Sequence, residues 1–529
     1  MTEGWREVAS LEELGPRGRR LVKVEGRQIA LFRSGDSVFA CNNRCPHEGY
    51  PLIEGSLAEG RDPGSCVLTC NWHNWKFDLV GGETLVGGDR LRRYPARVIE
   101  GRIQLDLSEP PAEVRRQAAL EGLAGAFRRN ERDRMAREVA RLEHAGGDPL
   151  DALRRAVEWT HERFEFGTTH ALAALPDWLR LRDERADGPA ERLVPLIEVL
   201  DHLNWDSLRE PARPFPEARA PWSAPALVEA VEAEDEAAAV AVLRGGLAEG
   251  LELEALEAAL AAAALAHYQD FGHSAIYTLK SRQAIERLGP EVAGPILLAL
   301  VRSLVMAQRE DRIPEFRAYA PALAAWDGRG DRPVEAADFR GLGVRQALAR
   351  CLESSARPDQ LQSALLGAAA EQWLCFDLAV ERRTDNPVSQ NVGWLDFTHP
   401  VTFANAARRL SARHPALRPA ALLQLACFLG RNATYRDEAV AEADWAVADP
   451  EAFFAEHFRR LFDHGVPEPI VAAHLVKVLT AVEQEWRAHP DAPWRPTLLA
   501  AARRFLDNPP KRRHGLRLAH QAIGFVEAE

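Results

Sequence analysis

Two short pairs of metal-binding residue types place the strongest constraint on this chain. Cys45 and His47 form a Cys-x-His pair, and Cys70 and His73 form a Cys-x-x-His pair. Together the pairs supply two thiolates and two imidazoles, and each spacing is short enough for the tip of one loop. We therefore expect residues 41–82 to fold around bound metal.

Two kinds of metal centre are compatible with these donors. In a tetrahedral zinc site, two cysteines and two histidines surround one ion, and Cys41 with Cys66, each four residues before a proposed ligand, could complete an all-cysteine set. In a [2Fe-2S] centre of mixed ligation, two thiolates hold one iron and two imidazoles hold the other. The residue types alone leave both alternatives open.

The residues after the second pair resemble the Rieske family of [2Fe-2S] proteins. Trp72, Trp75 and Phe77 follow Cys70, and Asp78 leads into a Gly-Gly turn, in the order of the second ligand loop, strand and hairpin of that family. The resemblance favours the iron–sulfur cluster over zinc.

The same resemblance implies a role for each donor. Cys45 and Cys70 would bind one iron, and His47 and His73 would bind the other. Such a centre passes single electrons and does no chemistry on a substrate itself.

Two departures from the family pattern refine this interpretation. Tyr50 and Trp72 occupy the positions where respiratory-complex Rieske proteins carry an additional disulfide, so the resemblance is to the ferredoxin and oxygenase branch. We expect a reduction potential toward the low end of the Rieske range, about −150 mV. The interval between the two pairs is long, and residues 58–64 are predicted to form an extra loop. Cys41 and Cys66 are then small core residues.

Composition and charge indicate a soluble globular protein. The 529 residues are 46% hydrophobic and 27% charged, and the net charge of −12 argues against a nucleic-acid partner. The N-terminus has no basic segment followed by an apolar run, and the most apolar stretch, 255–266, is short and contains Glu257, so we expect neither a signal peptide nor a membrane span. Seven cysteines fit a cytoplasmic location and no structural disulfides.

The patterns of strands and helices predict an α+β multidomain protein, with a small antiparallel β Rieske domain followed by a large all-α domain. Residues 1–107 contain short β-type runs separated by turns. Residues 108–113, with two adjacent prolines, form the linker. From 114 to 529, apolar residues recur at intervals of three and four, which predicts helices. Residues 183–225 contain seven prolines and are predicted to be a long irregular connection, a candidate division between two lobes.

The helical part carries histidines in polar or glycine-rich surroundings. The candidate catalytic residues are His161, His170, His267, His273 and His399. A second iron could be bound by these histidines together with Glu158 and Asp270. His267, Asp270 and His273 follow one another at steps of three, so on one helix they would roughly share a face. The number of acid-x-x-His pairs is close to chance, so the spacing alone does not identify a site.

Three of these histidines lie in segments that resemble the questin oxidase-like family. The segments are 166–172, 271–277, 397–404 and 422–433. Members of that family are helical, His-bearing oxidases of polyketide and other secondary metabolism, and some catalyse Baeyer–Villiger-type ring opening. The resemblance covers residues 150–480 and implies an oxidase, without assigning a role to any single residue.

A source of electrons inside the chain is not apparent. Gly341-x-Gly343 lacks a preceding strand and the third glycine of a dinucleotide-binding fingerprint. We therefore expect an external NAD(P)H-dependent reductase or a ferredoxin as the electron donor. Gly-x-Ser-x-Gly and P-loop patterns are missing as well, which removes the commonest hydrolase and NTPase interpretations.

These observations lead to one main interpretation and two alternatives. In the main one, the protein is an oxygenase-like or monooxygenase-like oxidoreductase whose cluster passes electrons to the helical domain for O2-dependent oxidation of a small organic molecule, within one chain or across a homo-oligomer. The first alternative is a Rieske electron carrier or redox sensor fused to a helical scaffold that docks a partner protein. The second is a metal-free, questin oxidase-like enzyme whose histidines act as general acids and bases.

Overall fold

The computed structural model describes residues 4–59, 66–386, 391–508 and 515–527. Contacts within the chain divide it into two compact units, Met1–Ala152 and Leu153–Glu529. The extra loop predicted at 58–64 falls mostly outside the described residues, because only Ala58 and Glu59 are described, and both belong to a strand.

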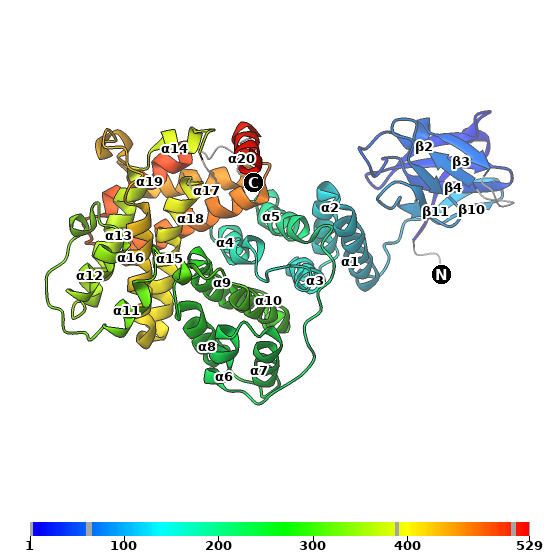
Figure 1. The fold of residues 1–529 in the computed structure, drawn as a ribbon. Coiled ribbons are helices and arrows are strands. Elements are labelled where there is room, and N and C mark those ends of the chain that lie inside the picture. Colours follow the sequence, from blue (N-terminus) through cyan, green and yellow to red (C-terminus); the bar gives the residue numbers. More distant parts are fainter. Residues whose placement is uncertain (1–3, 60–65, 387–390, 509–514, 528–529) are drawn as a thin grey trace. The chain divides into compact units, whose positions relative to one another are not determined.

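The first unit is built on three antiparallel sheets, as predicted for the β domain (Figure 1). Their strand orders are β1-β11-β10, β2-β3-β4-β9 and β5-β6-β7-β8. The bounds are β1 Trp5–Ser10, β2 Arg19–Val24, β3 Arg27–Ser34, β4 Ser37–Asn42, β5 Ser56–Glu59, β6 Cys66–Thr69, β7 Lys76–Asp78, β8 Thr84–Val86, β9 Arg93–Tyr94, β10 Ala96–Ile99 and β11 Arg102–Asp106. The tight β2–β3 turn places Glu25 and Gly26 at positive φ, which matches the twist of the strands that it joins.

Two helices follow the sheets and belong to the same compact unit. They are α1 (Ala112–Arg129) and α2 (Arg132–His144), which pack against each other. Asn130 has φ 55°, a left-handed conformation that ends α1. By contacts the first unit therefore extends beyond the predicted linker at 108–113 and includes residues that were expected in the helical domain.

The second unit is the predicted large all-α region. Its helices are α3 Leu150–Thr160, α4 His170–Arg185, α5 Pro189–Ser207, α6 Ala224–Glu232, α7 Glu236–Ala248, α8 Leu253–Leu265, α9 His273–Leu288, α10 Ala293–Val305, α11 Tyr319–Ala324, α12 Val344–Leu352, α13 Pro358–Leu374, α14 Leu378–Arg382, α15 Trp394–Arg413, α16 Arg418–Asn432, α17 Pro450–Arg460, α18 Pro469–Ala488, α19 Arg495–Asp507 and α20 Gly515–Glu527. The first residues of α3 precede the division between the units.

The prediction of an irregular connection over 183–225 is wrong for half of that segment. Helix α5 begins directly at Pro189, a position where the missing N–H of proline costs no hydrogen bond. Pro195 lies inside the helix and is buried. The irregular part is confined to residues 208–223, so the segment does not separate two lobes.

Four helices of the second unit form a closed ring. Helix α4 packs against α9 and α18, and α15 packs against the same two helices from the other side. Figure 1 shows these four helices in the middle of the unit. Residues far apart in the sequence are therefore brought to one central space.

Within the described residues, the stretch Pro290–Arg312 is long and apolar enough to cross a membrane by length and composition. Of its most apolar window, 61% is buried inside the second unit, as in a core helix. Arg302, in this stretch, is buried and forms an ion pair of 2.8 Å with Glu236. The stretch is therefore weak evidence for a membrane span.

Candidate metal centres

Two loops of the first unit share one backbone hydrogen-bond pattern. In the first loop (residues 45–50) and the second loop (residues 70–75), the N–H of the first residue donates to the carbonyl of the last, at 2.9 and 2.8 Å. The N–H of the fifth residue donates back to the carbonyl of the first, at 2.8 and 2.9 Å. That fifth residue is Gly49 or Asn74, with φ 76° and 62°, a region that these two residue types tolerate best. The sequence thus builds two matching ligand loops.

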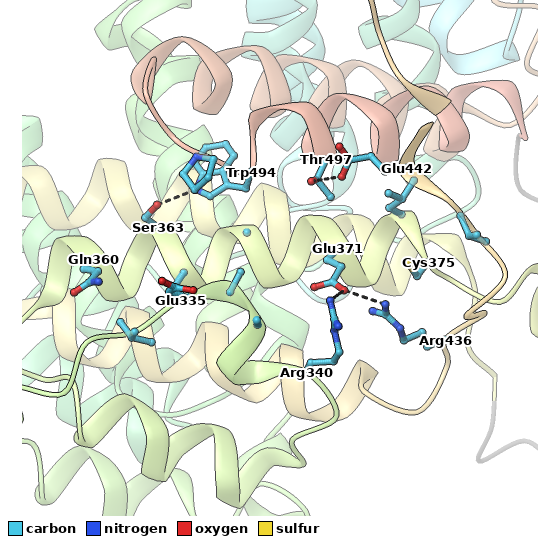
Figure 2. Close-up of a pocket in the computed structure, with 18 residues that line it drawn as sticks. Glu335, Arg340, Gln360, Ser363, Glu371, Cys375, Arg436, Glu442, Trp494 and Thr497 are labelled. Carbon is cyan, nitrogen blue, oxygen red and sulfur yellow. Dashed lines mark hydrogen bonds and ion pairs between the residues drawn. The ribbon is translucent and has the colours of Figure 1, made fainter. Parts of the chain in front are cut away.

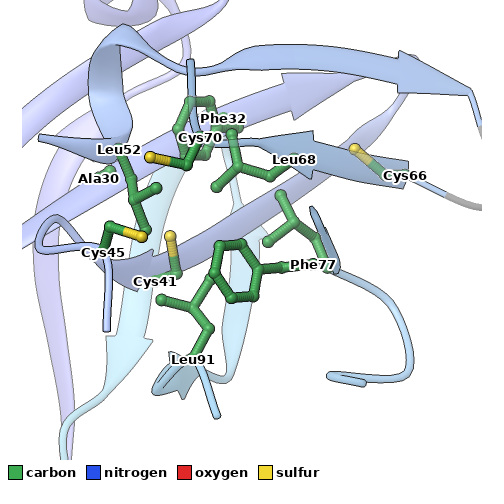
Figure 3. Close-up of a cluster of buried hydrophobic side chains, with 11 residues drawn as sticks. Ala30, Phe32, Cys41, Cys45, Leu52, Cys66, Leu68, Cys70, Phe77 and Leu91 are labelled. Atoms are coloured by element: carbon green, nitrogen blue, oxygen red, sulfur yellow. The ribbon is translucent and has the colours of Figure 1, made fainter. Parts of the chain in front are cut away.

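The thiols of the two loops face each other inside the core. Cys45 and Cys70 are 3% and 1% exposed, and the Cys45 thiol lies within hydrogen-bonding reach of the Cys70 thiol (Figure 3). Burial raises the pKa of Cys45 to about 11, although the N–H groups of His47 and Glu48 point at its sulfur and act in the opposite direction. A bound cation would displace the proton of the Cys45 thiol.

The two imidazoles lie together on the outer side. The rings of His47 and His73 are 4.4 Å apart at 82°, and each side chain is about one third exposed. Their Nε2 atoms face the Glu48 carboxylate, at 4.0 and 3.7 Å. The Nδ1 of His47 is buried and has no hydrogen-bond partner among the described residues, and Trp75 stacks on this ring at 4.7 Å.

This arrangement fits a two-iron cluster. The two sulfurs form one pair and the two imidazoles form another, as mixed ligation requires. An unpaired Nδ1 directed inward is costly unless a cation takes its lone pair. The N–H donors near the Cys45 sulfur would stabilise it as a ligand.

The other two cysteines of this region occupy core positions, as predicted. Cys41 lies in β4 and is fully buried, and burial raises its pKa well above the usual value. Cys66 begins β6, and Figure 3 shows its sulfur apart from those of Cys41, Cys45 and Cys70. The alternative of an all-cysteine zinc site therefore has no geometric support. All seven cysteines of the chain are free thiols.

A second group of donors lies in the helix ring of the second unit. Each helix of the ring contributes one histidine: His170 from α4, His273 from α9, His399 from α15 and His474 from α18. Ligand atoms of His170, His399 and His474 all lie within 4.8 Å of one another. The Nε2 of His273 is 3.3 Å from that of His170 and 3.0 Å from that of His399. We refer to these residues as the four-histidine group.

Backbone carbonyls fix the tautomers of three of these rings. The Nδ1 atoms of His273, His399 and His474 lie 2.7, 2.5 and 2.7 Å from the carbonyls of residues 270, 395 and 470. A carbonyl only accepts, so each Nδ1 carries the proton and each Nε2 carries a lone pair. The Nε2 of His474 is buried, with no hydrogen-bond partner in the part of the chain that the structure describes.

The converging lone pairs call for a cation. His273 and His399 bring two unprotonated Nε2 atoms to 3.0 Å, where no proton is available to link them. Nitrogens about 2.1 Å from one metal ion would lie roughly 3.0 to 3.4 Å apart. The spacing and the orienting carbonyls are compatible with an imidazole site for a transition metal.

Electrostatics keep the group uncharged at neutral pH. Burial lowers the pKa of His399 to about 3 and lowers the pKa of His170, His273 and His474 well below the usual value. Burial, together with the charge of Lys280, also lowers the pKa of Lys477 to about 7. Neutral imidazoles are the form that binds metal, so no proton competes strongly for the site.

Three of the five candidate histidines join this group, and the other candidates lie elsewhere. His161 stacks on Phe215 and its Nδ1 contacts the carbonyl of Glu158, whose carboxylate pairs with Arg155. His267 is buried 3.2 Å from Glu232.

The shared helical face predicted for His267, Asp270 and His273 does not exist. Helix α8 ends at Leu265, and Asp270, Phe271 and Gly272 all have positive φ before α9 begins at His273. Burial, followed by the charge of Glu310, raises the pKa of the Asp270 carboxyl to about 7, and only its carbonyl contacts the His273 ring.

His474 is a member of the group that the sequence motifs did not reveal. It has no acidic residue three positions away, and its neighbours in α18 are apolar. The available signal is that His474 and Lys477 are buried polar residues within the apolar first half of α18. Such residues need partners from other helices.

The second unit also contains a cavity of about 770 Å³. Figure 2 shows Arg340 and Arg436 both directed at the Glu371 carboxylate, and Trp494, also in the lining, donates to Ser363 at 2.9 Å. None of the four histidines lines this cavity.

Comparisons with known proteins define the class of the first unit. Residues 4–92 match the family model of the Rieske [2Fe-2S] domain. The ferredoxin component of a naphthalene 1,2-dioxygenase system from Pseudomonas aeruginosa is 32% identical over 111 residues, which is 20% of this chain and 100% of that protein. The chain therefore belongs to the Rieske [2Fe-2S] family through its N-terminal residues, and the prediction of a Rieske domain is confirmed.

Other relatives place the same domain in different settings. A 4beta-methylsterol monooxygenase from Methylococcus capsulatus is 33% identical over 118 residues, 20% of this chain and 30% of that protein. The solved ferredoxin of carbazole 1,9a-dioxygenase from Nocardioides aromaticivorans is 26% identical, covers 20% of this chain and 100% of that chain, and has a TM-score of 0.18. Each of these matches covers about a fifth of the chain.

Proposed function

We propose that the four-histidine group holds a non-haem iron ion, and that the protein uses electrons from its Rieske cluster for the O2-dependent oxidation of a small organic molecule. The observation that carries this proposal is the contact of two unprotonated Nε2 atoms at 3.0 Å, which a bound cation would turn from repulsion into attraction. Iron suits a site supplied by a one-electron donor, whereas zinc accepts imidazoles but has no redox chemistry.

In the first unit, we assign Cys45 and Cys70 to one iron of the cluster and His47 and His73 to the other. The pairing of buried thiols and partly exposed imidazoles supports this assignment. The imidazole edge is the part of the site nearest to solvent, so an external reductase or ferredoxin would deliver electrons there. Oxygenase-system ferredoxins among the relatives support a partner of this kind.

In the second unit, the chain's own residues prepare the metal site. When bound, iron would supply the binding and reduction of O2. The carbonyls that hold three Nδ1–H groups fix the orientation of those rings, and the Tyr277 hydroxyl, 3.2 Å from the Nδ1 of His170, orients the fourth. His170 and His273 are only partly buried, so a small molecule would approach from their side.

The resemblance to the questin oxidase-like family supports the same function. Three of its segments contain His170, His273 and His399, which the structure brings together. We therefore propose an aromatic or polyketide-like substrate, and a cytoplasmic location in keeping with the free thiols. A metal-free enzyme that uses these histidines as acids and bases near neutral pH fits less well, because burial holds their pKa values far below 7.

Iron per chain, measured after anaerobic reconstitution, tests the proposal. We expect about three iron atoms, two in a cluster with a Rieske-type EPR signal and one in the four-histidine group. His399→Leu should lose one iron and keep the EPR signal. The matched control His267→Leu, a buried histidine outside the group, should keep all three. Two irons in the wild type would contradict the proposal and favour an electron carrier or a metal-free oxidase. Three irons in His399→Leu would place the third iron outside the four-histidine group and would also contradict the proposal.

A further inference from the structure

Helix α2 contacts the first cluster loop although it lies outside the residues that match the Rieske family. The family match ends at residue 92, and α2 begins at Arg132. Arg137 on α2 donates from Nη1 to the Pro46 carbonyl and from Nη2 to the His47 carbonyl at 3.4 Å. A side chain from an added helix therefore reaches the backbone of a cluster ligand.

A buried carboxylate holds the guanidinium of Arg137 in place. Asp89 is 2% exposed and lies 2.6 Å from Arg137 Nη1. Burial opposes ionisation of Asp89, but hydrogen bonds from Arg141 and Arg137 prevail and hold its pKa below the usual value. Asp89 is thus an anion at neutral pH, and it orients the arginine toward the loop.

Arg141 provides a natural comparison on the same helix. It donates to Asp89 at 2.7 and 2.9 Å and to Glu138 at 2.8 Å. Its hydrogen bonds therefore anchor α2 to the sheets, and none of them goes to the first loop. The two arginines share the anchoring role, and only Arg137 joins that anchor to the loop that carries Cys45 and His47.

We propose that Arg137 is a positioning residue for the Rieske cluster, which fixes the first ligand loop through its carbonyls and favours the reduced cluster by its positive charge. Reduction adds one negative charge to the cluster, and a fixed cation next to a ligand stabilises that form. The carbonyls that Arg137 binds are those of Pro46 and His47, so the effect is transmitted through the ligand loop itself. This inference does not depend on iron in the helical unit.

The test compares three variants of the full chain with reconstituted cluster. Arg137→Gln removes the charge, Arg137→Lys keeps it without the fork that reaches both carbonyls and Asp89, and Arg141→Gln disrupts the same Asp89 anchor without touching the loop. The measurements are the midpoint potential of the cluster, its EPR g-values and its circular dichroism. Thermal unfolding of each variant reports the structural loss separately.

We expect Arg137→Gln to lower the equilibrium constant for reduction about tenfold, which corresponds to about 59 mV for one electron, and to shift the g-values. Arg137→Lys should recover at least half of this change. Arg141→Gln should change the equilibrium constant for reduction less than twofold, although its loss of thermal stability should be similar to that of Arg137→Gln. Loss of the cluster in Arg137→Gln alone would also support the proposal. An unchanged potential in Arg137→Gln, or equal shifts in Arg137→Gln and Arg141→Gln, would overturn it.

Discussion

Replacing His474 with leucine isolates the contribution of a bound cation to the stability of the second unit. In the metal-free protein the His474 Nε2 is buried without a partner. An unsatisfied buried acceptor costs about 1–3 kcal/mol, and the hydrogen bond from Nδ1 to the Ile470 carbonyl stabilises by about 1 kcal/mol. Leucine removes both, so the metal-free variant should be as stable as the wild type or up to about 2 kcal/mol more stable.

Bound metal should stabilise the wild type more than it stabilises His474→Leu. A ligand at 1,000 times its dissociation constant stabilises the folded state by about 4.1 kcal/mol. For the roughly 380 residues of the second unit, an unfolding entropy of about 2.1 cal/mol/K per residue converts this into an increase of about 5 °C in Tm. Loss of one of four ligands, taken as a 100-fold loss of affinity, would leave about 1.4 kcal/mol, or about 2 °C.

The assay is thermal unfolding with and without Fe2+ under anaerobic conditions, starting from chelator-treated protein. His267→Leu is the matched control, because His267 is also buried with an unpartnered Nε2 but lies outside the group. It should keep the full shift of about 5 °C. A full shift in His474→Leu, or no shift in the wild type, would refute the assignment of His474 as a metal ligand.

Three further predictions follow from the described contacts. Cys70→Ser should abolish the visible absorbance and EPR signal of the cluster and leave the iron of the helical unit bound; a retained Rieske spectrum would contradict the ligand assignment. Asp177→Asn removes the partner of Lys280, a buried ion pair of 2.6 Å, and should lower the free energy of unfolding by about 3–5 kcal/mol in denaturant titrations, with recovery in the double variant Asp177→Leu, Lys280→Met; a loss below 1 kcal/mol would contradict it. In chelated protein, stability should fall as the pH decreases from 7, because the unfolded chain binds a proton at His399 with a pKa of about 6.5 and the folded state does not until about pH 3. The loss is about 2 kcal/mol at pH 5 from this residue alone, and an equally steep profile in His399→Leu would contradict the reasoning.

The cluster site could be predicted because its donors are neighbours in sequence. Each loop carries a cysteine and a histidine within four residues, so the local backbone alone brings them together. The left-handed positions Gly49 and Asn74, which give the two loops the same shape, are not marked by the ligand spacing. The contribution of α2 could not be predicted either, because Arg137 and Pro46 meet only through the docking of the helix on Asp89.

The four-histidine group could not be predicted as a site from the sequence. Its members lie on four helices, and only the packing of the ring brings their Nε2 atoms together. Glu158 and His161 have the spacing of ligands but lie at another place on the unit, and the left-handed turn before His273 removes His267 from the shared face. His474 has no motif around it. Tertiary packing, which a single sequence does not encode locally, places the four histidines together and leaves Glu158 and His161 elsewhere, whereas a local left-handed turn displaces His267.

The order of the donors along the chain has a consequence for biosynthesis. The last cluster donor, His73, leaves the ribosome about 400 residues before His474, which is roughly 20 to 80 s at ordinary rates of synthesis. The first unit can therefore fold and receive its cluster while the helix ring is still missing α18. The iron proposed for the four-histidine group could be captured only after α18 has been made, so the two centres would mature as separate events and would respond differently to a shortage of iron during growth.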